Sequence, residues 1–164
     1  MSDALERPAL DTLAERWRAG WQGAGFESCC TPDVSYEDPV AVEPLRGVEA
    51  LDRHAAGLRA AFPDLRIEPT APPLLRESHA CIPWRAAGTH RGELGSMVPA
   101  TDRFVALHGV HYVELTDGAV RRARGFFDLY DAATQLGLLP TRGGLGEAAL
   151  LVLRGFGLRR RPAT

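Results

Sequence analysis

The chain has 164 residues, of which 45% are hydrophobic and 24% are charged, and its formal net charge at pH 7 is −2. This composition is typical of a single globular domain and excludes a disordered polypeptide. The charge balance does not favour nucleic acid as a partner, no apolar run reaches the ~20 residues of a membrane span, and the N-terminus lacks the layout of a signal peptide. We therefore expect a cytoplasmic protein that binds neither nucleic acid nor a membrane.

Lysine and asparagine are absent from the chain. Without lysine, Schiff-base catalysis and covalent attachment of pyridoxal phosphate are excluded. Cys29, Cys30 and Cys81 have no C-x-x-C spacing, and no pair of histidines has a spacing typical of metal sites. We therefore expect no disulfide framework, no metal ion and no cofactor.

Elements in the first half of the chain follow from the spacing of apolar residues. This spacing predicts a helix over residues 3–21, a brief strand over 34–37 and a second helix over 47–62. Alternating apolar residues then predict strands over residues 65–70 and 80–90. Two helices therefore precede most of the strands.

In the second half, a strand over residues 103–115 leads to a turn at Asp117 and Gly118, and another strand runs on to Asp128. An Asp-Gly pair is a strong hairpin signal, because both central residues must tolerate positive φ. A short helix over residues 131–136 follows. Helices followed by antiparallel strands predict an α+β fold, with the helices packed on one face of a curved sheet.

Residues that share one face of this hairpin are the first candidates for a functional site. Counting back from the turn places His111 opposite Arg124. Because side chains alternate along a strand, one face of the second strand carries every other residue: Val120, Arg122, Arg124, Phe126 and Asp128. If that face lines a pocket, Asp128 and His111 are the titratable groups inside it. A β-bulge would invert part of this assignment.

Several short motifs follow one another along the chain. They are Tyr36-Glu37-Asp38-Pro39, Gly47 before a helix, Ala61-Phe62-Pro63-Asp64, Gly88-Thr89-His90-Arg91-Gly92, Met97-Val98-Pro99-Ala100-Thr101 with Arg103, and Gly109-Val110-His111 running on to Asp128 and Gln135-Leu136-Gly137. In this order and spacing the chain resembles the SnoaL-like polyketide cyclase family, which has the nuclear-transport-factor-2-like fold. The resemblance covers about residues 10–140.

The resemblance implies a cone-shaped α+β domain over residues 1–140, in which a strongly curved mixed sheet packs on the N-terminal helices and encloses an apolar pocket. Residues 141–164 are then an extension that is helical or partly disordered. Cyclases of this family act in antibiotic biosynthesis and close a ring of an aromatic polyketide by an intramolecular aldol reaction, without a metal ion or a cofactor. The resemblance thus implies a cofactor-independent cyclase or isomerase, a hydrophobic carbonyl substrate and a homodimer.

The resemblance also assigns candidate residues. The acid/base residue of the family is an Asp on the last strand, which corresponds to Asp128, and two further catalytic candidates correspond to His111 and His90. An apolar pocket would raise the pKa of such a carboxyl toward neutral pH. The expected substrate pocket contains Trp84, Tyr36, Phe126, Arg124 and Met97.

Each catalytic assignment has a structural alternative. The alternative for Asp128 is a cap on the following helix, and the alternative for either histidine is a hydrogen-bonded strand residue without a catalytic role. Asp38 stands between Tyr-Glu and a proline, where we expect a turn residue.

Two departures from the family pattern leave other functions open. The chain has Phe126-Phe127-Asp128 where the cyclases have a Trp-Pro-Asp run, and Glu114 where some of them carry a basic residue. The first alternative function is a non-catalytic domain that binds small molecules. The second is an epoxide hydrolase, which would need Arg124 to face the pocket beside Asp128.

Overall fold

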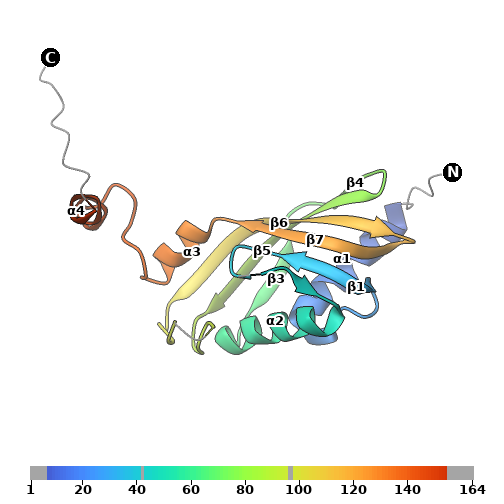
Figure 1. Ribbon diagram of the computed structural model, residues 1–164, viewed down its shortest axis with the longest axis horizontal. Coiled ribbons are helices and arrows are strands. Elements are labelled where there is room, and N and C mark those ends of the chain that lie inside the picture. Colours follow the sequence, from blue (N-terminus) through green and yellow to red (C-terminus); the bar gives the residue numbers. More distant parts are fainter. Residues whose placement is uncertain (1–6, 42, 96–97, 155–164) are drawn as a thin grey trace, which may run out of the picture.

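The computed structural model describes residues 7–41, 43–95 and 98–154 of the chain (Figure 1). Within these ranges the helical elements are α1 (Arg7–Ala19), a short π-helical turn η1 (Gly20–Ala24), α2 (Val48–Ala61), α3 (Leu129–Gln135) and α4 (Leu145–Leu153). The strands are β1 (Cys30–Glu37), β2 (Leu45–Arg46), β3 (Arg66–Pro69), β4 (Leu74–Arg76), β5 (His79–Thr89), β6 (Phe104–Thr116) and β7 (Ala119–Phe127). The predicted helices and strands are confirmed, except that residues 3–6 lie outside the described residues.

The described strands form one mixed sheet in the order β2-β1-β7-β6-β5-β3, with β4 paired to β5. Strand β1 runs parallel to β7, whereas the other pairs are antiparallel. Helices α1 and α2 lie on one side of this twisted sheet (Figure 1). The predicted α+β class, with helices against a curved mixed sheet, is confirmed.

The hydrophobic core lies between α1, α2 and the inner face of the sheet. Leu10, Leu13 and Trp17 occupy one face of α1 and are buried, as their spacing predicts. From α2, Leu51 and Ala55 join the same cluster. Burial of this apolar surface holds the helices on the sheet and leaves room at one end of the inner face for a pocket.

A β-bulge in the β6–β7 hairpin corrects the predicted register. Leu115 pairs with Val120 as predicted, but Glu114 pairs with Arg122, so Arg121 is an extra residue on β7. Because one inserted residue reverses the alternation, every β7 side chain beyond the bulge changes face. His111 consequently lies opposite Gly125 rather than Arg124.

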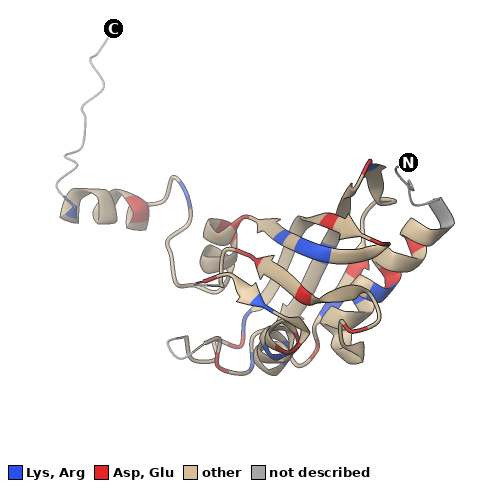
Figure 2. Ribbon diagram, turned by 45° about the vertical axis from the view of Figure 1, so that its right-hand side comes forward, with Lys and Arg blue, Asp and Glu red and all other residues tan. Residues whose placement is uncertain are grey.

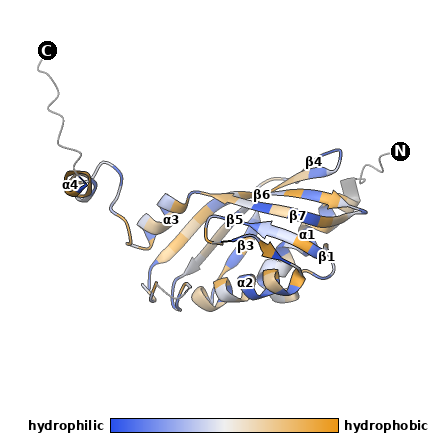
Figure 3. Cartoon of the chain, in the orientation of Figure 1, coloured by the Kyte–Doolittle hydropathy of each residue, from blue (hydrophilic) through white to orange (hydrophobic). Residues whose placement is uncertain are grey.

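After the bulge, the inner face of β7 carries Ala123, Gly125 and Phe127, whereas the predicted pocket residues Arg124 and Phe126 point outward. Figure 3 shows hydrophobic and hydrophilic residues mixed along β6 and β7. Phe126 is 50% exposed. The prediction that these two residues line the pocket is therefore wrong.

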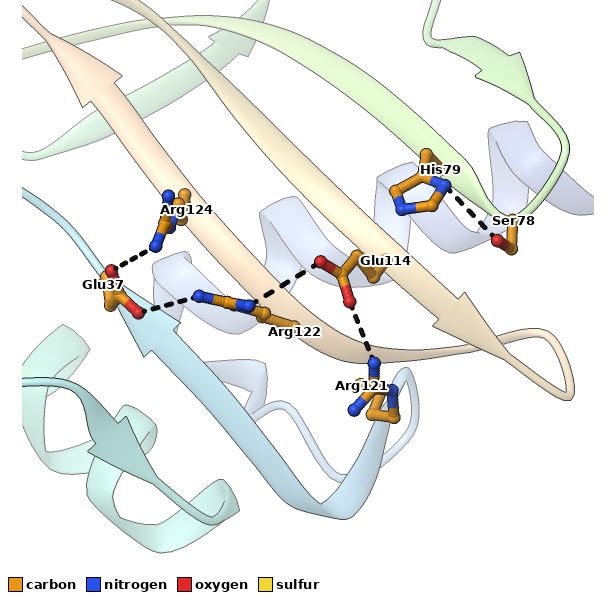
Figure 4. A network of polar contacts seen from close by, with 7 residues as sticks. All are labelled: Glu37, Ser78, His79, Glu114, Arg121, Arg122 and Arg124. Atoms are coloured by element: carbon orange, nitrogen blue, oxygen red, sulfur yellow. Dashed lines mark hydrogen bonds and ion pairs between the residues drawn. The ribbon is translucent and has the colours of Figure 1, made fainter.

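Charged side chains on the outer face of the sheet pair across neighbouring strands (Figures 2 and 4). Glu37 on β1 contacts Arg122 at 3.3 Å and Arg124 at 3.1 Å. Glu114 on β6 contacts Arg121 at 2.9 Å. Exposed pairs of this kind contribute about 0–1 kcal/mol each, so this network is a minor contribution to stability.

The helix α4 lies apart from the sheet in Figure 1, and none of its residues is buried. A hydrogen bond connects the segment before α4 to α3: the hydroxyl of Tyr130 donates it to the carbonyl oxygen of Pro140 at 3.0 Å. Among the described residues, no helix combines the length and apolar character needed to cross a membrane.

Candidate functional site

The inner face of the sheet, η1, α2 and α3 surround a pocket of about 270 Å³. Most of its lining is aliphatic or aromatic and includes Leu58, Phe62, Leu65, Ile67, Val105, Leu107, Phe127, Leu129 and Leu136. Tyr36, Asp38 and His111 bring polar side chains to this lining, and Asp38 is the one carboxyl group among the described lining residues. A mainly apolar lining with a few polar groups is the usual character of a small-molecule pocket.

Strand β1 positions Tyr36 and Asp38. Val34 and Tyr36 are buried on its inner face, and two residues further on Asp38 keeps the same direction just after the strand ends. Pro39 then stops the strand. The side chain of Asp38 is only 3% exposed, and its Oδ1 atom accepts hydrogen bonds from the backbone N–H groups of Val40 at 2.8 Å and Ala41 at 2.7 Å.

The second oxygen of Asp38 contacts a histidine. Its Oδ2 atom lies 2.8 Å from Nε2 of His54, which projects from α2. Burial acts to raise the pKa of the Asp38 carboxyl, but the hydrogen bond and charge of His54, together with the two backbone donors, hold that pKa below its ordinary value. Asp38 is therefore an ionised carboxylate at neutral pH, in a position from which it can accept a proton.

His111 lies in an aromatic cage. Its ring stacks on Trp21 with centroids 5.3 Å apart, and rings of Trp17, Trp84 and Tyr36 surround it at 5.4, 5.3 and 6.1 Å. No group in the described part of the chain hydrogen-bonds to this imidazole. Burial lowers its pKa to about 3, although the charge of Asp38 acts in the opposite direction. The ring is therefore neutral, with one nitrogen that can donate a hydrogen bond to a ligand and one that can accept a hydrogen bond from it.

Tyr36, Asp38 and His111 converge above Gly125. A Cβ atom at that position would lie 2.6 Å from the hydroxyl of Tyr36, 3.2 Å from Cβ of Asp38 and 3.5 Å from Cδ2 of His111. Only glycine leaves room for this approach. Burial, followed by the nearby charge of Asp38, raises the pKa of Tyr36 well above its ordinary value, so its phenol keeps its proton as a donor.

The structure places Asp128 at the N-terminus of α3 rather than in the pocket. Its Oδ1 accepts a hydrogen bond from the backbone N–H of Asp131 at 2.9 Å, and its Oδ2 lies 3.5 Å from Arg142. The side chain is 53% exposed and is not part of the pocket lining. Its predicted pocket position, which drew on the family resemblance and on a hairpin register without the bulge, is therefore wrong.

The predicted histidines have different surroundings. His111 lines the pocket, whereas His90 is fully buried outside it. Nδ1 of His90 accepts a hydrogen bond from the backbone N–H of Thr101 at 3.2 Å, and its ring lies 5.1 Å from that of Phe62. The prediction that His90 lies in the pocket is therefore wrong. Its bonds instead connect the end of β5 to the loop before β6.

Of the other predicted pocket residues, Trp84 and Tyr36 line the cavity, and Met97 lies outside the described residues. Sequence reasoning missed His54 and interpreted Asp38 only as a turn residue. Asp38 does form the turn, but the same side chain faces the pocket. The available signal was the two-residue spacing from Val34 through Tyr36 to Asp38, which continues the inner face of the strand.

No arrangement for a metal ion is found in the described ranges, since no three or more His, Cys, Asp or Glu side chains are suitably grouped there. The polar end of the pocket instead offers a carboxylate, a phenol and a neutral imidazole. These groups can accept a proton and donate hydrogen bonds to an oxygen on which negative charge develops.

Solved structures share this fold. TsrD from Streptomyces laurentii is 22% identical, with a TM-score of 0.73, over 82% of this chain and 99% of that one. A proposed SnoaL-like polyketide cyclase from Jannaschia sp. CCS1 is 21% identical, with a TM-score of 0.64, over 80% and 96% of the two chains. A protein from Catenulispora acidiphila DSM 44928 with a ketosteroid isomerase-like fold is 16% identical, with a TM-score of 0.64, over 77% and 92%.

At these levels of identity the structural matches establish the fold alone. No curated protein matches the sequence. A family model described as SnoaL-like polyketide cyclase matches residues 9–136, which is most of the chain. The chain therefore belongs to the SnoaL-like polyketide cyclase family.

Proposed function

We propose that the chain is a cofactor-independent enzyme of the cyclase or isomerase type, acting on a hydrophobic carbonyl compound, with Asp38 as its acid/base residue in place of Asp128. The observation that carries this proposal is the buried Asp38 carboxylate at one end of an otherwise apolar pocket. Family membership supports the type of reaction. A polyketide substrate from antibiotic biosynthesis, a homodimer and a cytoplasmic location are part of the proposal and rest on the family resemblance.

The chemistry begins with a proton on a carbon next to a carbonyl group. The Asp38 carboxylate takes this proton, and the electron pair of the C–H bond moves into an enolate. Tyr36, whose phenol stays protonated, and His111, whose ring is neutral, are the groups that can donate hydrogen bonds to the enolate oxygen. The enolate carbon then attacks a second carbonyl carbon, and Asp38 returns its proton to the new alkoxide. In an isomerisation, Asp38 returns the proton to a different carbon.

An apolar pocket suits this reaction because it excludes water from the enolate and strengthens every hydrogen bond to it. Trp84 and Phe127 provide flat surfaces beside the polar end, with ring centroids 6.1 Å apart. Because their planes are inclined by 60°, the two rings form one angled apolar wall on which a ring of the substrate can pack. The neutral ring of His111 can act as a hydrogen-bond donor to the substrate without placing a positive charge in the apolar pocket.

The test is hydrogen exchange at the activated carbon of a probe ketone. Wild-type protein is incubated with 2-tetralone, an apolar bicyclic ketone, in D₂O, and deuterium incorporation is followed by proton NMR. We expect catalysed exchange that falls by about 10²-fold or more in Asp38→Asn, the range for loss of a positioned acid/base group. The matched control is Asp128→Asn, which should exchange at the wild-type rate.

Two outcomes would contradict the proposal. Full exchange by Asp38→Asn would reject Asp38 as the base. Saturable binding of 2-tetralone without exchange in the wild type would favour the non-catalytic binding domain. The structure does not favour an epoxide hydrolase, because Arg124 pairs with Glu37 on the outer face and does not face the pocket beside Asp128.

A further inference from the structure

We infer that His54 is a positioning residue for Asp38, which orients the carboxylate and leaves a single lone pair on Oδ2 as the site that accepts the proton. This inference rests on the proposed function and deepens it. It assigns a role to a residue on α2 that neither the family motifs nor the sequence pattern singled out.

The hydrogen bonds around Asp38 support this assignment. Each carboxylate oxygen has two lone pairs. Both lone pairs of Oδ1 are used by the backbone N–H groups of Val40 and Ala41. One lone pair of Oδ2 is used by Nε2 of His54 at 2.8 Å. These three donors leave the second lone pair of Oδ2 for a substrate proton, and the nearby Tyr36 phenol is a further hydrogen-bond donor to the same carboxyl.

His54 is held well enough to perform this role. It lies on the buried side of α2, in the same turn as Leu51 and next to Ala55, which are both in the core. Its ring packs against Trp21 at 6.1 Å and Tyr36 at 5.8 Å, and its side chain is 16% exposed. A rigid helix thus fixes the donor, and exclusion of water strengthens its bond to Asp38.

The protonation states around Asp38 define what His54 contributes. The titratable groups next to Asp38 are His54 from α2, which lowers the pKa of the carboxyl, and Tyr36 from β1 and His111 from β6, whose own pKa values the charge of Asp38 acts to raise. Tyr36 and His111 are both neutral at pH 7, because burial raises the pKa of the phenol and lowers the pKa of the imidazole. His54 is therefore the group among the three that counteracts the burial of Asp38. Without it, only the backbone N–H groups of Val40 and Ala41 would oppose burial, and the pKa of the Asp38 carboxyl would rise.

His54 keeps its own proton throughout the reaction. Because an ionised carboxylate can only accept hydrogen bonds, Nε2 of His54 carries a hydrogen and donates it to Oδ2. Asp38 takes the substrate proton on the free lone pair of Oδ2 and later returns it to carbon or to an alkoxide. The His54 bond weakens while Oδ2 is protonated and strengthens when the carboxylate is restored.

The experiment is a titration of Asp38 in full-length protein with ¹³C-labelled aspartate carboxyl groups, in which the Asp38 signal is identified by its loss in Asp38→Asn. His54→Gln keeps an N–H donor at a similar reach but cannot become charged, whereas His54→Leu removes the donor. We expect the titration midpoint of Asp38 to be lowest in the wild type, higher in His54→Gln and highest in His54→Leu. The total rise should be about one pH unit or more, a tenfold change in proton affinity.

His79→Gln is the matched control, because this histidine lies on the outer side of the sheet and bonds to Ser78 (Figure 4). It should leave the Asp38 midpoint unchanged. An unchanged midpoint in folded His54→Leu, checked by circular dichroism, would overturn the inference. Should His54→Leu fail to fold, a midpoint in His54→Gln equal to that of the wild type would overturn it in the same way.

The titration needs no turnover, so it separates this inference from the proposed function. Exchange of 2-tetralone by Asp38→Asn rejects the proposed function, whatever the titration gives. If Asp38 is the base, the pH at which wild-type exchange declines on the acid side should move upward in His54→Leu by the same amount as the NMR midpoint, and partly in His54→Gln. A purely structural role for His54 would lower the exchange rate without moving this pH.

Discussion

The imidazole of His111 stacks on the indole of Trp21, with ring centroids 5.3 Å apart and an interplanar angle of 3°. The two residues come from β6 and η1, so the contact joins the sheet to the end of the first helix. It also keeps the imidazole away from water. The uncharged state of His111 at neutral pH is therefore a property of this packing, and it has a measurable consequence for stability.

The first prediction concerns the dependence of stability on pH. The pKa of His111 is about 3 in the folded chain and near 6.5 in the unfolded chain, so between these values the unfolded chain binds more protons. The stability that depends on a neutral His111 is thus fully present above pH 6.5, and it is lost as the pH falls toward 3. We expect His111→Phe to lose less stability than the wild type between pH 6.5 and 5, by on the order of 2 kcal/mol.

This difference is measured by urea unfolding at both pH values. Phenylalanine keeps an aromatic ring in the cage but cannot be protonated. The difference between the two proteins in their loss of unfolding free energy therefore removes the contributions of the remaining histidines. Equal losses of stability in the two proteins would show that His111 is not held neutral by burial.

The second prediction concerns Gly125. In Gly125→Ala the new Cβ atom would come within 2.6 Å of the Tyr36 hydroxyl, so Tyr36 or β7 must move. We expect a loss of about 1–3 kcal/mol in the free energy of unfolding, typical of an overpacked core, together with weaker binding of 2-tetralone. Thermal unfolding and fluorescence titration measure the two effects.

The matched control is Gly57→Ala in α2, where nothing lies within 4 Å of the added Cβ. Because alanine is favoured over glycine inside a helix, this variant should gain roughly 0.5–1 kcal/mol. Opposite signs for the same chemical change would confirm that close approach, and not the loss of glycine itself, determines the effect at Gly125. A neutral Gly125→Ala variant would contradict the convergence of the three polar groups.

The third prediction separates the two aspartates. Asp128→Ala removes the N-cap of α3 and should cost about 1 kcal/mol of stability. Asp128→Ser, which retains a capping oxygen, should restore most of it. Urea unfolding measures this cost, and the exchange of 2-tetralone should stay at the wild-type rate in both variants. A loss of exchange in Asp128→Ser comparable to that in Asp38→Asn would return the acid/base role to Asp128.

Local sequence patterns were sufficient for most of the fold. The spacing of Leu10, Leu13 and Trp17 predicts the buried face of α1 because a helix repeats every 3.6 residues. The Asp117-Gly118 turn predicts the β6–β7 hairpin, and both residues adopt positive φ in the structure. The short strands β2 and β4 escaped prediction, because two or three residues carry too little alternation to be recognised.

The site was less predictable, for two physical reasons. The extra residue Arg121 in β7 reverses all later side chains, and no periodic signal in the sequence marks its position. That single residue moved Arg124 and Phe126 to the outer face. The partner of Asp38 was also hidden, since His54 lies 16 residues away on another element.

The sequence by itself determined the class of fold, the helical faces, the hairpin turn and the family, because these depend on local periodicity and on ordered motifs. Only the tertiary structure decided which carboxyl faces the pocket, since that depends on strand register and on which side chains exclude water from one another. Asp128 and Asp38 both follow the last residue of a strand. Packing exposes the first as a helix cap and buries the second beside His54.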